Sequence, residues 1–325
     1  MKRNSRNILN ALKRSHTSGS AKHASGGSHS AKTTRINLNG LFNNKRKKAS
    51  HSVHVKSSAL TFVKNHSRIV AGLALVVALA ILGIYSYISN PGQHSNDEFL
   101  FNKTYDWSNL YANDGLYSYK EHGEVKSRVG IDVSEHQHYI DWNTVAAEGI
   151  DFAFIRVGNR GTSEGRILQD EYFDYNIDAA SSAGLDVGVY FFSQSINEDE
   201  AREEANFVLE KIKGKKVSYP IVYDHEPISG VSSRADNLSV EQMTKNAQAF
   251  CEVINDAGYN AMIYGNSRDL SRYDLSQLSS WGIWLAHYGS SVPDWNNGFS
   301  IWQYSNSGQI NGIDTAVDLD IHFLP

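Results

Sequence analysis

Cysteine is almost absent from this sequence. Cys251 is the only one among 325 residues, so no disulfide can form within the chain. It stands in an apolar helical pattern with Met243, Ala247, Phe250 and Ile254, which indicates a buried structural thiol rather than a nucleophile. A domain without disulfides needs a large hydrophobic core, and about 200 residues are enough to supply one.

Acidic residues are missing from the first part of the chain. Residues 1–68 contain fifteen of the 31 lysines and arginines and none of the 35 aspartates and glutamates. They also contain few large apolar residues, which predicts a disordered basic tail joined to a separate acidic domain. The basic clusters favour contact with anionic lipid headgroups, and no nucleic-acid partner is expected.

Charge is also absent from residues 69–88, IVAGLALVVALAILGIYSYI. At about 1.5 Å per residue, a helix of this length spans roughly 30 Å, the thickness of a bilayer core. A cleaved signal peptide is the alternative, but its apolar region is usually only about 7–15 residues long and lies near the N-terminus. Lys64 and Arg68 precede the run, and the next basic residue is Lys103. The positive-inside rule therefore predicts a single-pass cell-membrane protein with a cytoplasmic N-terminus and residues 89–325 outside the cell.

The remainder of the chain alternates apolar runs with polar segments. Residues 89–128 are polar and rich in Asn and Tyr, which predicts an extracellular stalk and a short strand or hairpin leading into a domain at 129–325. Eight candidate strands follow: GIDVS (130–134), FAFIRVG (152–158), DVGVYFFS (186–193), YPIVYDHE (219–226), YNAMIYGN (259–266), GIWLAHY (282–288), FSIWQYS (299–305) and AVDLDIHF (316–323). Continuous apolar runs of this kind are typical of a parallel sheet covered on both faces.

Helix signals lie between the early strands and are scarce between the last three. Asn197, Ser239 and Asp141 are expected to cap helices, and Asp170 is expected to begin another. Eight strands with fewer helices predict an α/β fold, an irregular TIM-like β/α barrel over residues 129–325.

The predicted strand ends carry acids and aromatic residues. In a β/α barrel, catalytic residues lie at the C-terminal ends of the strands. The candidates found there or within the last runs are Asp132, Tyr190, Asp224, Glu226, Tyr264, Trp284, Tyr288, Trp302, Gln303 and Asp318. We expect them to converge on one mouth and to form a sugar-binding cleft, although the aromatic residues could equally belong to the core.

Asp224 and Glu226 are two residues apart in an extended segment. Their side chains therefore point to the same side, roughly 6.5 Å apart along the strand, while His225 points the other way. Mutual repulsion and burial raise the pKa of one carboxyl, and a protonated Glu beside an ionised Asp suits cleavage of a glycosidic bond. A helix cap or a divalent-metal site is the alternative; histidine ligands are few here, so no metal or other cofactor is expected.

Five motifs, in order, resemble those of glycoside hydrolase family 25, the Chalaropsis-type lysozymes: GIDVSEHQ, YPIVYDHE, WLAHY, IWQYS and AVDLDIHF. The resemblance covers about residues 129–325. It implies a flattened β/α barrel that hydrolyses the β-1,4 bond between N-acetylmuramic acid and N-acetylglucosamine in peptidoglycan. It also implies roles for individual residues: Glu226 as general acid, Asp224 and Asp132 in the catalytic set, Asp318 as a supporting acid, and Tyr190, Tyr264, Trp284, Tyr288 and Trp302 along the groove.

One motif departs from the family pattern. The family often shows a run like Lys-Ala-Thr-Glu-Gly after the second strand, whereas residues 156–161 read RVGNRG and contain no acid. A catalytic scheme that needs a carboxylate at that point is therefore in doubt, which favours Glu226 and Asp224.

Other functions remain open from the sequence. A non-catalytic module could bind peptidoglycan glycan strands in the same groove, and a metal-dependent deacetylase could act on the same wall. A chitinase-like enzyme is disfavoured because its longer D-x-x-D-x-D-x-E run is missing. A tether at residues 69–88 restricts the domain to nearby wall, which suits remodelling rather than general lysis.

Overall fold

The structure is a computed structural model that describes residues 99, 104–289 and 291–325. These residues belong to the second of two compact units, residues 86–325. The predicted tail at 1–68, the predicted membrane span at 69–88 and residues 89–98 and 100–103 of the predicted stalk lie outside the described residues. Within the described part of the chain, no helix is long and apolar enough to cross a membrane.

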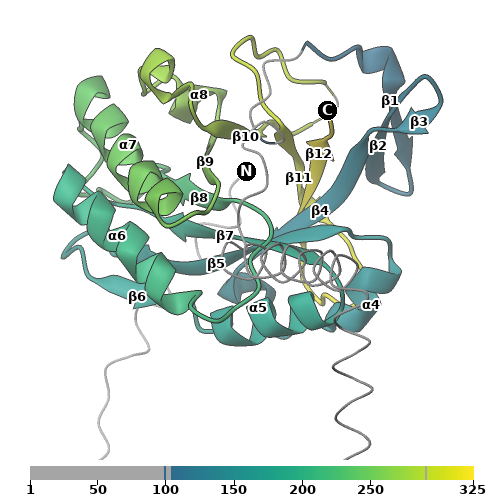
Figure 1. The fold of residues 1–325 in the computed structure, drawn as a ribbon, viewed down its shortest axis with the longest axis horizontal. Coiled ribbons are helices and arrows are strands. Elements are labelled where there is room, and N and C mark those ends of the chain that lie inside the picture. The colour runs from purple at the N-terminus through teal and green to yellow at the C-terminus, as the bar shows by residue number, and fades with distance from the viewer. Residues whose placement is uncertain (1–98, 100–103, 290) are drawn as a thin grey trace, which may run out of the picture. The chain divides into compact units, whose positions relative to one another are not determined.

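Eight strands close into a barrel (Figure 1). They are β4 (Ser127–Val133), β5 (Phe152–Arg160), β7 (Asp186–Phe192), β8 (Ile221–Asp224), β9 (Ala261–Asn266), β10 (Gly282–Ala286), β11 (Ile301–Gly308) and β12 (Val317–Phe323). Their order around the barrel is β4-β12-β11-β10-β9-β8-β7-β5, and β5 pairs with β4 to close it. The short strand β6 (Ile167–Gln169) adds an antiparallel edge to β5. Each barrel strand corresponds to one of the eight runs expected from the sequence.

The barrel is mixed rather than wholly parallel. Strands β4, β5 and β7 to β11 run parallel to one another, whereas β12 is antiparallel to both β11 and β4. Only residues 309–316 connect β11 to β12, which is too short for the crossover that a parallel pair requires. The N-terminal end of β12 therefore lies at the same mouth as the C-terminal ends of the other strands.

Helices cover the outside of the barrel (Figure 1). They are α4 (Trp142–Ala147), α5 (Phe173–Ser182), α6 (Glu198–Lys211), α7 (Val240–Asp256) and α8 (Ser267–Leu270), with the 3₁₀ turns η3 (Glu135–Gln137) and η4 (Leu275–Leu278). Asp141, Asn197 and Ser239 cap α4, α6 and α7 as expected. Helix α5 begins at Phe173, three residues after Asp170, whose carboxylate accepts from Arg156, from Glu135 N and from Tyr172 N.

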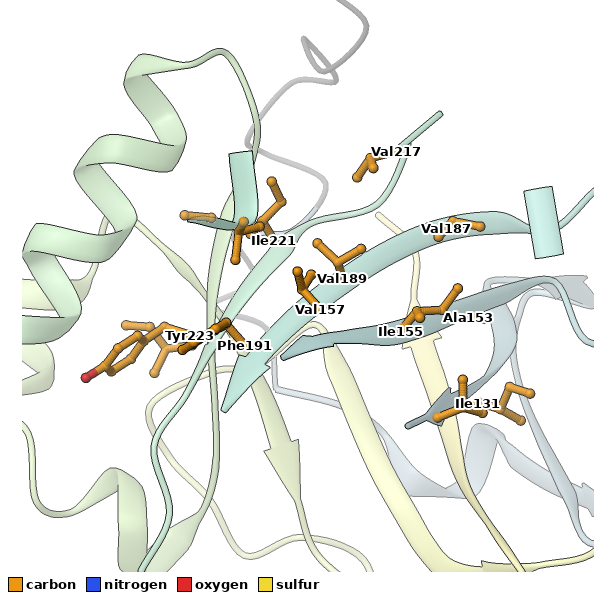
Figure 2. Packing of buried hydrophobic residues seen from close by; sticks show 14 of the residues in the cluster. Ile131, Ala153, Ile155, Val157, Val187, Val189, Phe191, Val217, Ile221 and Tyr223 are labelled. Atoms are coloured by element: carbon orange, nitrogen blue, oxygen red, sulfur yellow. The ribbon is translucent and has the colours of Figure 1, made fainter. Parts of the chain in front are cut away.

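Two hydrophobic layers follow from the alternation of side chains along each strand. One set of positions, including Ile155, Val189 and Tyr223, belongs to the cluster that also contains the buried residues of the helices. Figure 2 shows these three side chains on the barrel strands. The other set fills the barrel and includes Phe154 and Trp284. Only glycine fits at position 188 beside this inner layer, since an added Cβ would lie 2.4 Å from the Phe154 ring. The floor of the barrel is thus solid, and chemistry is confined to its mouth.

Residues ahead of the barrel form a small antiparallel sheet. It follows the turn η2 (Trp107–Asn109) and consists of β1 (Leu110–Asn113), β2 (Leu116–Glu121) and β3 (Glu124–Val125). Tyr119 of β2 is buried, with its ring 5.4 Å from that of Phe323 in β12 and its N–H donated to Ser127 Oγ at 2.8 Å. Part of the segment expected to be a stalk is therefore packed against the barrel.

Candidate active site

A pocket of about 210 Å³ opens at the mouth where the strand ends meet. All four predicted acids line it, together with four of the six other predicted residues. Its walls are Asp132, Ser134, His136, Gln137, Arg156, Tyr190, Phe192, Asp224, Glu226, Tyr264, Trp284, Gln303 and Asp318. The mouth thus combines carboxyl groups with aromatic rings, the two chemistries that a carbohydrate site needs.

Asp132 and Asp318 face each other because β12 is antiparallel to β4. They are direct register partners, and such positions place Cβ atoms about 4.5–5.5 Å apart. Burial raises the pKa of Asp318 to about 6. Burial also raises the pKa of Asp132, and the neighbouring Asp318 and Asp320 raise it further. No group of three or more His, Cys, Asp or Glu side chains in the described ranges is arranged to hold a metal ion.

Gln303 fixes the orientation of Asp132. Its amide nitrogen donates to Asp132 Oδ2 at 2.5 Å, while its amide oxygen accepts from Tyr264 Oη at 2.8 Å and from the Tyr288 hydroxyl. Two donors on the oxygen leave only the amide nitrogen to meet Asp132. The carboxylate oxygen is therefore held as an acceptor, and this hydrogen bond opposes the rise in the Asp132 pKa caused by burial.

Asp224 is the last residue of β8, and Glu226 follows just beyond the strand. Asp224 is 4 % exposed, and its Oδ1 is buried with no hydrogen-bond partner among the described residues. Burial raises the pKa of Asp224, and the Glu226 carboxyl raises it further. Burial, with Asp269 and Asp318 nearby, raises the pKa of Glu226 to about 7. The pair therefore retains a proton near neutral pH and contains one buried acceptor without a partner among the described residues.

His225 does not line the pocket. It is buried, with its ring 6.3 Å from that of Tyr223 on the outward face of β8. Burial lowers its pKa to about 4, so the imidazole is neutral at physiological pH. This placement agrees with the alternation expected from the sequence and leaves the two carboxyl groups as the polar end of β8.

A buried network supports the loop that carries Glu226. Gln194 Nε2 donates to the Glu226 carbonyl at 3.1 Å, and Ser193 N donates to the Asp224 carbonyl at 2.7 Å. Ser193 Oγ in turn donates to Glu204 Oε2 at 2.6 Å, and Arg160 Nε donates to Glu204 Oε1 at 2.7 Å. Helix α6 therefore anchors the C-terminal end of β8 through hydrogen bonds rather than through apolar packing alone.

Arg156 is the cation of the mouth. It stands at a register shift in the β5–β7 pairing, and it binds Asp170 at 2.8 Å and Glu135 at 3.0 Å. The RVGNRG run therefore places a guanidinium, that of Arg156, in the pocket wall. The second arginine of the run, Arg160, is buried in the Glu204 network.

Trp284 forms part of the pocket wall above the barrel core. Its indole Nε1 donates to Asp320 Oδ1 at 2.8 Å, and its ring stacks on Phe154 with centroids 4.5 Å apart. Tyr264 meets the same indole edge-on at 4.7 Å. The tryptophan is thus held rigidly, and Asp320 acts below the pocket rather than in it.

Two predicted residues do not line the pocket. Tyr288 lies at the rim, 42 % exposed, and reaches the site through its hydroxyl contact with Gln303. Trp302 is 1 % exposed in the outer hydrophobic layer, where its Nε1 donates to the His287 carbonyl at 2.8 Å. Neighbouring residues of a strand point to opposite faces, so Gln303 and Trp302 cannot both face the mouth.

The pocket also contains residues that were not predicted for it: Ser134, His136, Gln137, Arg156 and Phe192. Three of them lie in or beside η3, where Ser134 and Gln137 form a capping box. The pattern S-x-x-Q directly after the first strand was a readable signal for this turn. The sequence did not indicate that Arg156 lines the pocket, because nothing in it shows the register shift of β5 beside this residue.

Comparison with known proteins places these observations in a family. Residues 131–313 match the family model described as glycosyl hydrolases family 25. The autolytic lysozyme of Clostridium acetobutylicum is 26% identical over 191 residues, covering 59% of this chain and 54% of that protein. Lysozyme M1 of Streptomyces globisporus is 30% identical over 209 residues, covering 58% of this chain and 65% of that protein.

The fold has solved relatives as well. The modular autolysin LytC of Streptococcus pneumoniae, solved in complex with a synthetic peptidoglycan ligand, is similar with a TM-score of 0.56 at 27% sequence identity. The likeness covers 65% of this chain and 51% of that one. The present chain thus spans about half the length of these first relatives, and the likeness concerns the barrel domain.

Proposed function

The chain belongs to glycosyl hydrolases family 25, and from that premise we propose that its barrel hydrolyses the β-1,4 bond between N-acetylmuramic acid and N-acetylglucosamine in peptidoglycan. The observation that carries the proposal is the Asp224–Glu226 pair, in which a carboxyl with a raised pKa adjoins a buried acceptor without a partner. Lysozymes among the relatives support the same activity.

Glu226 is the general acid of the proposed reaction. Its pKa of about 7 leaves a large fraction protonated at neutral pH. It gives this proton to the glycosidic oxygen as the bond from that oxygen to the anomeric carbon of the muramic acid residue breaks. The N-acetylglucosamine side then leaves as a neutral alcohol.

Asp224 positions the group that replaces the leaving oxygen. Its vacant Oδ1 accepts the N–H of the substrate's 2-acetamido group, which directs the carbonyl oxygen of that group at the anomeric carbon. Water then opens the cyclic intermediate, and Glu226, now ionised, takes the proton of that water. Direct attack by a water held at Asp132 is the competing scheme. Retention of anomeric configuration supports the first scheme, and inversion supports the second.

Replacement of the acid tests the proposal. Glu226→Gln keeps the size of the side chain and removes the proton donor, so release of reducing ends from purified cell walls should fall at least about 100-fold. The thermal unfolding midpoint should change little. Binding of the native protein to walls without any release would favour a non-catalytic module, and loss of activity with a chelator would favour a metal-dependent deacetylase.

The setting of the enzyme is a further part of the proposal. We infer from the uncharged run at 69–88 and the basic residues before it that the chain is anchored in the cell membrane, with the barrel outside and the tail near anionic lipid. Such a tether suits local remodelling of the wall. Protease added to intact spheroplasts tests this topology. It should digest the barrel and leave the tail intact, and the reverse pattern would contradict the proposal.

A further inference from the structure

A group of aromatic rings lies on the rim of the mouth, outside the pocket. It comprises His138 and Tyr139, which follow η3, and Tyr172 and Tyr175 at the start of α5. Tyr139 is 65 % exposed, the most exposed large hydrophobic side chain of the described residues, and Tyr175 is 37 % exposed. The mechanism above uses none of these residues.

The exposed rings are held in place. Tyr139 and Tyr175 stack with centroids 5.1 Å apart at an angle of 27°, and Tyr175 Oη donates to the Ile140 carbonyl at 2.7 Å. Ile140 forms a bridge with Ile313, and Asp141 N donates to the Gly312 carbonyl at 2.9 Å, so the loop is fastened on its other side too. A surface tyrosine fixed in this way loses little conformational entropy when a ligand covers it.

The rings adjoin the pocket on two elements. Gln137 lines the pocket and lies two residues before Tyr139, which is at most roughly 7 Å of extended chain. On the other element, Arg156 of the pocket wall binds Asp170, and Asp170 Oδ1 accepts from Tyr172 N at 3.0 Å. The aromatic rim is therefore a continuation of the pocket wall.

We propose that Tyr139 and Tyr175 form a stacking platform that binds a sugar residue of the glycan strand beyond the residues being cleaved. This inference rests on the proposed function. Tyrosine offers an apolar face with a polar edge, which matches a pyranose ring bearing hydroxyl groups. The occupant is a sugar rather than a protein, because two partly exposed rings offer far less than the roughly 800 Å² per partner of a stable protein interface.

The platform predicts that long strands bind better than short ones. Dissociation constants are measured with the full chain in detergent, on the Glu226→Gln background so that the glycan stays intact. Long uncrosslinked glycan strands are compared with a tetrasaccharide of the same repeat. Tyr139→Ala should weaken binding of long strands roughly three- to tenfold, the range of a single aromatic contact. Tyr139→Phe should retain most of the affinity.

Tyr111→Ala is the matched control. Tyr111 is also exposed, at 49 %, but it lies on β1, away from η3 and α5, and its loss should leave the dissociation constant unchanged. Equal affinity of Tyr139→Ala and its parent for long strands would overturn the platform. Cleavage of the tetrasaccharide by the native chain is measured separately; its absence would contradict the proposed function, while the binding comparison would still decide the platform.

Discussion

At the scale of single residues, burial determines the chemistry of the site. Carboxyl groups at a solvent-exposed strand end would be ionised and inert as acids at neutral pH. Here the barrel core below and the aromatic residues beside them remove water, which raises the pKa values of Asp224, Glu226 and Asp318. In the proposed reaction, Glu226 then acts as proton donor, Asp224 as hydrogen-bond acceptor and Asp318 as the supporting acid.

The pH dependence of activity follows from Glu226. The acid works only when protonated, so kcat/KM should fall about tenfold per pH unit above about pH 7. Asp269 is one of the charges that raise this pKa, so Asp269→Asn should move the alkaline limb to lower pH. Glu241 is an exposed acid on α7, and Glu241→Gln serves as the control in the same pH–rate series. A limb that stays in place in Asp269→Asn would contradict the assignment of the titrating group.

Glu204 should make stability depend on pH. Burial raises its pKa to about 7 from 4.5, so the folded state binds more protons than the unfolded state between these values. The stabilising contribution is therefore complete below pH 4.5 and is lost as the pH rises to 7. The loss amounts to at most roughly 3 kcal/mol in the free energy of unfolding.

Urea denaturation across this pH range checks the Glu204 prediction. Glu204→Gln should remove that part of the slope, because the amide does not titrate. Glu203→Gln is the matched control, since Glu203 also binds Arg160 but its side chain is 63 % exposed. An unchanged slope in Glu204→Gln would show that another group titrates.

At the scale of elements, the sequence predicted which segments form strands but not the direction of the last one. The run 316–323 has the same apolar character as the parallel strands, and only the short connection before it required an antiparallel return. The position of Asp318 shows the consequence, because it enters the pocket from the N-terminal end of β12 and not from a C-terminal end.

Other differences also arise from tertiary contacts. Trp302 and Gln303 share one run, and the sequence alone did not show which of them points inward. Asp170 was expected to begin a helix, but its carboxylate also accepts a hydrogen bond from Arg156 of β5. The helix pattern around Asp170 gave no sign of this contact. The S-x-x-Q turn after β4 was visible in the sequence, whereas the stacked pair Tyr139 and Tyr175 depends on the packing of α5.

The small sheet β1–β3 should contribute to the stability of the barrel. Tyr119 is 2 % exposed and packs on Phe323 and on Tyr105, 5.8 Å away. Tyr119→Ala should therefore lower the free energy of unfolding by about 3 kcal/mol. Tyr111→Ala on the exposed side of the same sheet should change it by less than about 0.5 kcal/mol. Equal effects of the two substitutions in chemical denaturation would show that the sheet is only an appendage.

At the scale of the whole molecule, the sequence divides into two parts of opposite charge. Residues 1–68 are basic and are proposed to lie near anionic lipid, while the acidic remainder of the chain holds the barrel and its carboxyl-lined pocket. The proposed tether between them would keep a wall-cutting enzyme close to its membrane. The proposed role in wall remodelling depends on the central claim that the barrel cleaves the bond between N-acetylmuramic acid and N-acetylglucosamine.

Mass spectrometry of the fragments released from purified peptidoglycan tests that claim most directly. The full chain should yield fragments that end in reducing N-acetylmuramic acid, and Glu226→Gln should yield none above background. Reducing ends of N-acetylglucosamine, deacetylated but uncut strands, or equal release by Glu226→Gln would contradict the proposed muramidase.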